Sequence, residues 1–114
     1  MLPEDRDKSY LYDILTYTTE IIEITKDESH SSFVNNRVKR LAVERLIEIV
    51  GEAANHLSEK IRLEYSEIPW SKIIGLRNKI AHDYGEILTD RIWLIATRSI
   101  PELLEQIKAK NIFD

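Results

Sequence analysis

Apolar residues recur at spacings of three and four along nearly the whole chain, and no segment shows the two-residue alternation of a half-buried strand. Only 3 Gly and 3 Pro interrupt the 114 residues, which leaves few places for tight turns. The sequence therefore predicts an all-α fold, an antiparallel up-and-down bundle of four to five helices. At this length we expect a single domain over residues 1–114 with one core.

The first helix is predicted over residues 4–26, followed by a serine-rich turn at 27–32. A long second helix is predicted over residues 33–61, and a third from residue 69 to near residue 85. The second helix is expected to bury one apolar stripe, made of Val38, Leu41, Ala42, Leu46, Ile49, Ala53 and Leu57.

Three positions mark expected breaks or contacts. Thr89 or Asp90 can cap a fourth helix, and Pro101 is expected to interrupt that helix or to begin another. Gly51 lies inside the second predicted helix, where glycine costs about 1 kcal/mol relative to alanine. We interpret Gly51 as a packing position that permits the close approach of another helix.

Charge and composition limit the classes of function. The 16 Lys and Arg against 20 Asp and Glu give a net charge of −4, which argues against a dedicated duplex-binding module but leaves room for a local phosphate-contacting cleft. The chain has no Cys, as is common in a reducing cytosol, so we expect a cytoplasmic protein. It has no apolar run of about 20 residues, so no membrane span is expected. It also lacks a metal-binding His motif and a glycine-rich phosphate loop, so neither a metal nor a cofactor is expected.

The most informative motif lies on the third predicted helix. It reads Arg77-Asn78-Lys79-Ile80-Ala81-His82-Asp83-Tyr84. An arginine presents a fork of donors suited to phosphate oxygens, and a histidine can transfer a proton near neutral pH. A guanidinium and an imidazole at fixed spacing suffice, in principle, to cleave a phosphodiester without a metal.

The spacing within this motif bears on assembly. Arg77 and His82 are five residues apart, which on a helix is about 140° of rotation and roughly 7.5 Å of rise. They are therefore not neighbours on one face, and two copies meeting across a two-fold axis would make a better site than one copy. The plainer interpretation is an exposed helix without catalytic function, in which Asp83 pairs with Lys79.

The Arg-x-x-x-x-His-x-Tyr pattern resembles the signature of the HEPN superfamily, and specifically its toxin branch that is paired with a minimal nucleotidyltransferase antitoxin (HepT/MntA type). Three further segments resemble that branch, so the similarity spans nearly the whole chain. They are residues 45–54 in the second predicted helix, 68–76 before the motif, and 100–103 near the end.

The resemblance implies a small α-helical bundle that forms a two-fold homodimer with both motifs in one cleft. It also implies a metal-independent endoribonuclease acting on RNA as the toxin of a type II/VII-like toxin–antitoxin module. Arg77 would contact the scissile phosphate and His82 would be the acid–base residue, with Asn78 and Asp83 in support. Tyr84 matches the tyrosine that the nucleotidyltransferase antitoxin modifies with AMP.

Two interpretations of function follow. In one, the protein is an RNA-cleaving toxin silenced by its cognate nucleotidyltransferase. In the other, it is a non-catalytic bundle whose motif binds a nucleotide or the nucleotidyltransferase partner. A basic rim around the motif would favour the first, and a neutral or acidic rim would favour the second.

Overall fold

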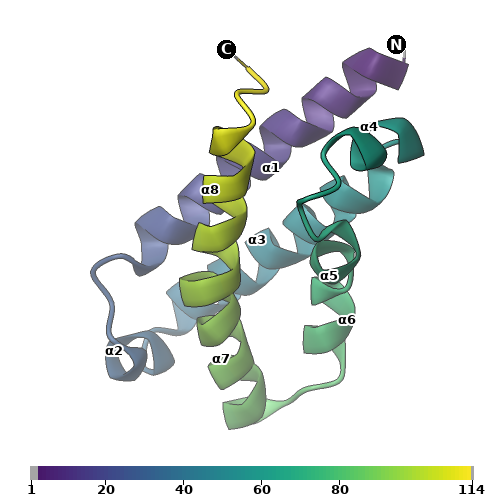
Figure 1. Ribbon diagram of the computed structural model, residues 1–114. Helices are drawn as coiled ribbons and strands as arrows, with labels where there is room; N and C mark the ends of the chain where they lie inside the picture. Colours follow the sequence, from purple (N-terminus) through teal and green to yellow (C-terminus); the bar gives the residue numbers. More distant parts are fainter. Residues whose placement is uncertain (1–2, 114) are drawn as a thin grey trace.

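A computed structural model describes residues 3–113 of the chain, and helices joined by short turns account for most of them (Figure 1). The described part contains no strand and measures 43 × 28 × 25 Å along its principal axes. The all-α helical bundle predicted from the sequence is thus confirmed. None of the described helices is both long and apolar enough to cross a membrane.

The helices divide into long and short ones. In chain order they are α1 (Pro3–Thr25), α2 (His30–Val34), α3 (Arg37–His56), α4 (Glu59–Glu64), α5 (Trp70–Ile74), α6 (Leu76–Ala81), α7 (Gly85–Leu94), the π-helical segment η1 (Ile95–Ser99) and α8 (Ile100–Ala109).

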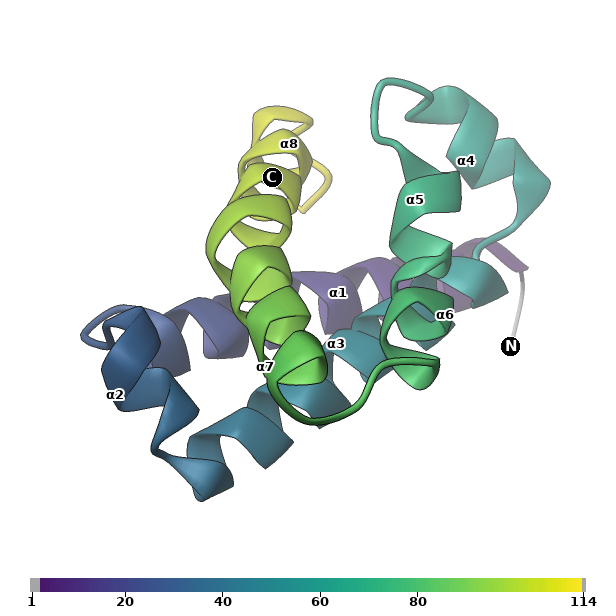
Figure 2. The same cartoon turned by 90° about the horizontal axis from the view of Figure 1, so that it is seen from below.

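The helices form two layers. Helices α1 and α3 lie side by side as one layer, and most of the contacts that α1 makes are with α3. Against this pair stand two arms, an α5–α6 arm and an α7–α8 arm that includes η1 (Figure 2). The arms are joined at one end by residues 82–84.

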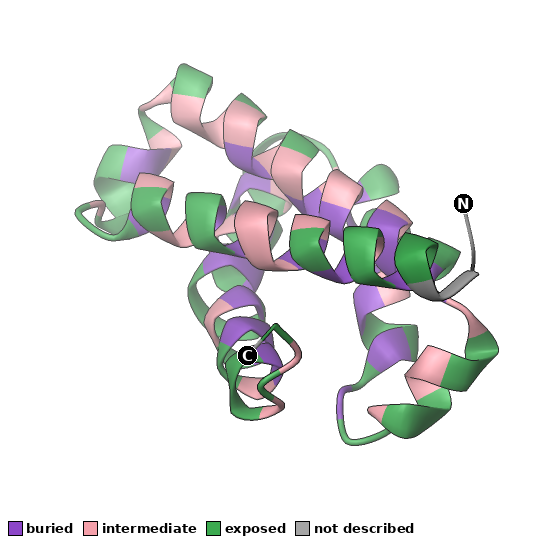
Figure 3. Ribbon diagram, turned by 90° about the horizontal axis from the view of Figure 1, so that it is seen from above, coloured by how far each residue is buried: buried purple, intermediate pink, exposed green. Residues whose placement is uncertain are grey.

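Burial follows from this layering, because each helix turns one apolar face toward the other layer (Figure 3). The fully buried side chains form one connected cluster that draws on both layers. Its largest members include Phe33, Leu11, Ile14, Ile21, Ile47, Ile92 and Ile107. Phe33 packs against the ring of Trp93 with 5.1 Å between centroids, which fixes α2 to the α7–α8 arm.

The first predicted helix is confirmed to within a residue at each end, whereas the second was predicted too long. The region 33–61 contains three helices, because polar side chains cap new helix starts inside it. Asn36 accepts a hydrogen bond from the Lys39 N–H and begins α3. Ser58 caps α4, and the carboxylate of buried Asp7 accepts hydrogen bonds from the Ser58 N–H and hydroxyl at 2.8 and 2.6 Å.

The predicted apolar stripe of the second helix was wrong in part. Val38 and Leu41 are 78% and 49% exposed, whereas the buried face of α3 is formed by Val43, Ile47, Val50, Gly51, Ala53 and Ala54. Helix α3 carries apolar residues around most of its circumference, so the sequence alone does not determine which stripe faces the core.

The third predicted helix was also too long, and this changes how the motif is presented. The segment is divided at Gly75 into α5 and α6, and α6 ends at Ala81. Asp83 therefore lies in the connection and Tyr84 occupies the N-cap position of α7 without a side-chain capping bond, so the eight-residue motif does not lie on one helix. Gly85, near which the third helix was predicted to end, instead opens α7 with a φ of +55° that other residues rarely adopt.

Neither Thr89 nor Asp90 caps a helix, because α7 begins four residues before Thr89. Thr89 is buried, and its hydroxyl donates to the Gly85 carbonyl at 3.1 Å. Pro101 lies in the first turn of α8, directly after the π-helical segment. A proline removes one backbone donor and clashes with the carbonyl four residues earlier. The wider π turn relieves this clash, so the α7–α8 arm continues through Pro101.

The interpretation of Gly51 as a close-approach position is confirmed. A Cβ atom at Gly51 would lie 3.3 Å from the Ile73 carbonyl oxygen and 3.9 Å from the Arg77 Cβ. Helix α3 thus touches the backbone of the α5–α6 arm directly, at the point where the arm carries the first residue of the motif.

We predict that Gly51→Val lowers the free energy of unfolding by about 1–3 kcal/mol, because the three carbon atoms of the added isopropyl group overpack this contact. Urea denaturation followed by circular dichroism measures the effect. Leu41→Val is the matched control, since it places a β-branched residue on the exposed side of the same helix. A Gly51→Val protein as stable as the parent would show that the arm is not held at Gly51.

Candidate functional site

A pocket of about 260 Å³ lies between α3 and the α5–α6 arm, directly above Gly51. Arg77 and Asn78 line it from α6, and Glu52 and Asn55 line it from α3. The sequence placed Arg77 and Asn78 next to each other, and the fold adds the two α3 side chains. Gly51 lines the pocket as well, and a Cβ added there would lie 3.9 Å from the Arg77 Cβ.

The Arg77 guanidinium has one carboxylate near it. Its Nη1 atom lies 3.7 Å from Glu52 Oε1, and the two side chains are 60% and 39% exposed. Glu52 is shared with Arg45, whose Nη1 lies 3.8 Å from the same oxygen. Exposed pairs of this kind contribute about 0.2–1 kcal/mol at most, so Arg77 can exchange Glu52 for a phosphate at low cost.

His82 is the residue at which α6 ends. It is exposed, and its imidazole forms no hydrogen bond or ion pair with any of residues 3–113. It does not line the pocket that holds Arg77 and Asn78. Within one chain, Arg77 and His82 are therefore close in sequence but do not share an enclosed site.

Asp83 has a different partner from the one that the plainer interpretation assigned to it. Its carboxylate accepts a hydrogen bond from Arg91 Nε of α7, and not from Lys79. The Asp83 side chain is only 16% exposed, so the pair ties the 82–84 connection to the α7–α8 arm. Asp83 thus holds the segment that presents His82 and Tyr84.

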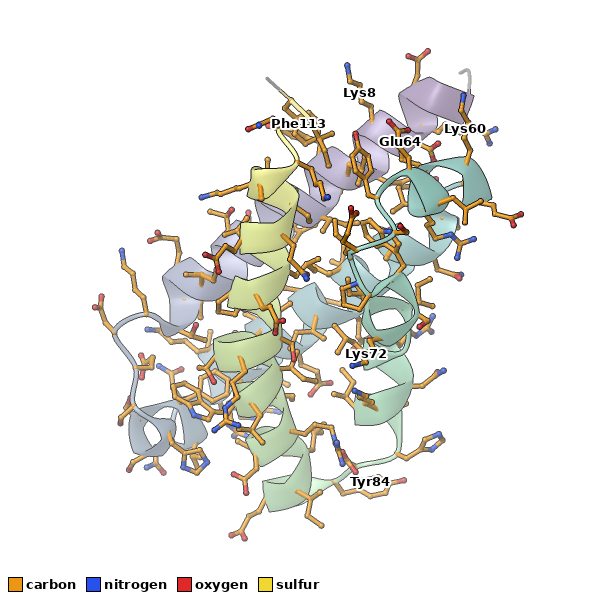
Figure 4. All side chains as sticks on the ribbon, viewed as in Figure 1. Lys8, Lys60, Glu64, Lys72, Tyr84 and Phe113 are labelled. Carbon is orange, nitrogen blue, oxygen red and sulfur yellow. The ribbon has the colours of Figure 1, made fainter. Side chains whose placement is uncertain are left out.

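Tyr84 projects into solvent from the end of the molecule where the two arms join (Figure 4). The residue is 84% exposed, and its hydroxyl has no hydrogen-bond partner among the described residues. Gly85 follows with open space around its Cα, since no atom lies within 4 Å of a Cβ built there. A group attached to the Tyr84 hydroxyl would meet no obstruction from its own chain at Gly85.

Sequence reasoning missed three residues that the fold brings to this region, namely Glu52, Asn55 and Arg91. Glu52 directly follows Gly51, and this position places it beside the arm that packs there. Over the described range, no three His, Asp or Glu side chains gather as metal ligands would.

The comparisons with known proteins agree with one another. The model of the family described as "Ribonuclease HepT-like" matches residues 14–109. A "Putative RNase" of Methanocaldococcus jannaschii is 36% identical over 101 residues, which cover 89% of this chain and 93% of that protein. Another of that name from Caldanaerobacter subterraneus is 37% identical, with 89% of this chain and 90% of the relative covered.

A third relative carries a more specific name. The "Probable ribonuclease HepT" of Thermococcus cleftensis is 30% identical over 96 residues, covering 84% of this chain and 87% of that protein. No solved structure matches the chain. The family match covers most of the chain and includes the whole of the Arg77–Tyr84 motif, and on this evidence the chain belongs to the HepT-like ribonuclease family.

Proposed function

We propose that this protein is a metal-independent endoribonuclease whose reacting groups are Arg77 and His82. The observation that carries the proposal is that both side chains are exposed and accessible to a substrate. Arg77 is more than half exposed with one weak carboxylate neighbour, and His82 has no partner among residues 3–113. A cation and a proton carrier that are both accessible are what phosphodiester cleavage requires.

The reaction we propose is internal transfer within RNA. The 2′-oxygen of one ribose forms a bond to the adjacent phosphorus, the bond from phosphorus to the 5′-oxygen of the next nucleotide breaks, and a 2′,3′-cyclic phosphate and a 5′-hydroxyl result. The 2′-hydroxyl gives up a proton and the leaving 5′-oxygen receives one, so a base and an acid are both needed. Arg77 stabilises the charge that develops on the phosphoryl oxygens.

Three further positions of the motif have a role in this proposal. His82 transfers the proton, and Asn78 orients the substrate or the His82 ring from one turn below on α6. Asp83 acts in support by holding the connection against Arg91. Because one imidazole cannot be base and acid at the same moment, a two-fold dimer that brings two His82 side chains together completes the site.

Exposed apolar side chains near the motif support such a dimer. Ile87 and Leu94 are 66% and 47% exposed and lie seven residues apart on α7, which places them on one face. Arg91 lies between them and binds Asp83, so this face continues into the 82–84 connection. A partner seated there would bring its own motif next to this one.

We further propose that the protein is the toxin of a toxin–antitoxin pair and that a cognate nucleotidyltransferase silences it by attaching AMP to Tyr84. The exposure of the Tyr84 hydroxyl supports this, because an acceptor must be reachable by a second enzyme. The added phosphate would introduce a negative charge beside the motif and compete with RNA for Arg77.

For catalysis, we predict that His82→Ala lowers the rate of RNA cleavage by about 10²–10⁴-fold in the presence of EDTA, because proton transfer is lost. The melting temperature and helix content should not change, since His82 is exposed. His56→Ala is the matched control, because His56 is also exposed and its one ring contact among the described residues is the stack on Tyr10. Cleavage at the parent rate by His82→Ala would refute the assigned role.

The binding interpretation is separated in the same experiment with Arg77→Ala. If the parent protein cuts no RNA but binds a nucleotide through Arg77, the protein is a binding bundle rather than a nuclease. If the parent cuts RNA and Arg77→Ala does not, the enzyme interpretation stands.

For assembly, we predict that the protein is a dimer in solution and that Ile87→Asp shifts it toward monomer, because a charge would be buried at the proposed interface. Small-angle scattering and light scattering over a concentration series measure this. Leu63→Asp is the control, since Leu63 is similarly exposed at 67% but lies on α4, away from the motif. A monomeric parent at working concentration would count against the composite site.

For control by the partner, we predict that co-expression with the neighbouring nucleotidyltransferase adds AMP at Tyr84 and abolishes cleavage. Intact-mass and peptide mass spectrometry locate the adduct. Tyr12→Phe should still be silenced, because Tyr12 is 60% exposed but lies on α1, whereas Tyr84→Phe should escape. AMP found at another residue, or full silencing of Tyr84→Phe by the active partner, would remove the proposed switch.

A further inference from the structure

A second pocket, of about 290 Å³, opens between the two arms on the other side of α6 from Arg77. Lys72, Leu76 and Lys79 line one wall from the α5–α6 arm, and Ser99, Glu102 and Gln106 line the other from η1 and α8. Figure 4 shows Lys72 on the α5–α6 arm at this gap. We call this pocket the inter-arm groove.

Two cations in the inter-arm groove have no counterion. The ammonium groups of Lys72 and Lys79 form no ion pair or hydrogen bond with any of residues 3–113. The acid expected to pair with Lys79 is Asp83, and Arg91 occupies it. Glu102 lines the same groove but does not pair with either lysine.

The position of the two lysines relative to the motif indicates a use for them. Lys72 and Lys79 are seven residues apart and share one side of the arm, as the groove lining shows. His82 follows Lys79 by three residues, which is about one helical turn and roughly 5 Å along the α6 axis. A polyanion bound at His82 can therefore continue along Lys79 and Lys72 without leaving the surface of the arm.

The rest of the lining indicates what part of a polyanion would bind. Ser99 and Gln106 offer neutral donors whose side chains have no partner within the described part of the chain, and the floor is apolar. The lining of the groove includes no aromatic side chain, so nothing there would stack a base. Such a site contacts phosphates and sugars and reads no sequence.

We propose that the inter-arm groove is a phosphate-backbone subsite for single-stranded RNA, in which Lys72 and Lys79 hold two phosphates of the strand that flanks the scissile bond at His82. The substrate class rests on the proposed function, since RNA is the polyanion that a ribonuclease must hold. The subsite explains how a chain with a net charge of −4 can bind RNA, because the binding cations are concentrated beside the reacting group.

The test measures binding without cleavage. In a His82→Ala background, a fluorescently labelled single-stranded RNA octamer is titrated with protein, and the anisotropy is followed over a series of NaCl concentrations. The Lys72→Ala/Lys79→Ala variant is compared with Lys26→Ala/Lys108→Ala. This control removes one lysine directly after the end of α1 and one from α8, both outside the groove. Both double variants change the net charge by the same amount.

We expect the groove variant to weaken binding and to reduce the slope of log K against log salt by about 1.4, because each single-stranded phosphate contact contributes about 0.7. The control variant should keep the slope of the parent. Lys72→Arg/Lys79→Arg should also keep it, since a backbone contact needs only the positive charge. Circular dichroism should show equal melting temperatures, because all four lysines are exposed.

Each other outcome overturns the subsite. An unchanged slope in the groove variant shows that Lys72 and Lys79 do not hold phosphates, and equal losses in both double variants show only a general charge effect. No RNA binding at all by the His82→Ala protein has the same consequence. Cleavage by the parent is assayed separately, so a groove that binds RNA in a protein that does not cut it refutes the proposed function alone.

Discussion

The contact at Gly51 is the constraint on which the arrangement of the motif depends. Because position 51 has no side chain, the carbonyl of Ile73 comes within 3.3 Å of where a Cβ would be, and the α5–α6 arm lies directly on α3. This contact places Arg77 beside Glu52 and leaves a pocket beneath the guanidinium. Glycine at this position lowers the stability of α3 by about 1 kcal/mol relative to alanine, but it allows the close packing of the arm on α3.

The other end of the motif depends on helix termini and not on packing within a helix. Because α6 ends at Ala81, His82 lies just beyond the helix, and the positive φ of Gly85 lets the chain turn into α7. Asp83 and Arg91 close this turn with an ion pair between the connection and α7. The motif therefore runs from a pocket wall at Arg77 to an exposed helix start at Tyr84, and its residues meet different surroundings although they are consecutive.

The sequence predicted the helices more accurately than their ends. The apolar spacing identified the all-α class, and the first helix was placed to within a residue, because a long amphipathic pattern is a strong signal. The breaks at Asn36 and Ser58 were missed, since a capping side chain competes with helix continuation only when its backbone partners are in place. The π segment before Pro101 was equally invisible, because a proline signals a conflict and not the way in which the chain resolves it.

In the candidate site, likewise, the residues of a local pattern could be predicted from the sequence, and the residues from other helices could not. Arg77, Asn78, His82 and Tyr84 were singled out as candidates because a short pattern contains them, whereas Glu52 and Arg91 come from other helices and were not. The partner of Asp83 was wrong for this reason, since a neighbour four residues away is readable from a sequence and one on the next helix is not. Tertiary contacts thus decide which charges are neutralised, and the spacing of residues within one helix gives only candidates.

The pairing of charges by tertiary contacts affects the electrostatics of the whole surface. Most acids that the structure pairs lie away from the motif, and two of them, Glu28 and Glu67, are held in their charged form. The hydrogen bond from Lys39, together with one from the Ser32 hydroxyl, keeps the pKa of Glu28 below its ordinary value, and a bond from Lys110 does the same for the pKa of Glu67. A lowered pKa means that such a pair stabilises the fold above the ordinary carboxyl range and is lost only as the pH falls through the lowered value.

At neutral pH these pairs are therefore intact, and their fields largely cancel within the Debye length of about 8 Å in physiological salt. Lys72 and Lys79 have no such partner in the described part of the chain, and Arg77 has only a distant one at 3.7 Å. Lys72 and Lys79 therefore present to an approaching polyanion positive charges that no acid among the described residues pairs with. The net charge of −4 consequently limits long-range attraction to nucleic acid, while the local order of cations along the α5–α6 arm decides where a strand can be held.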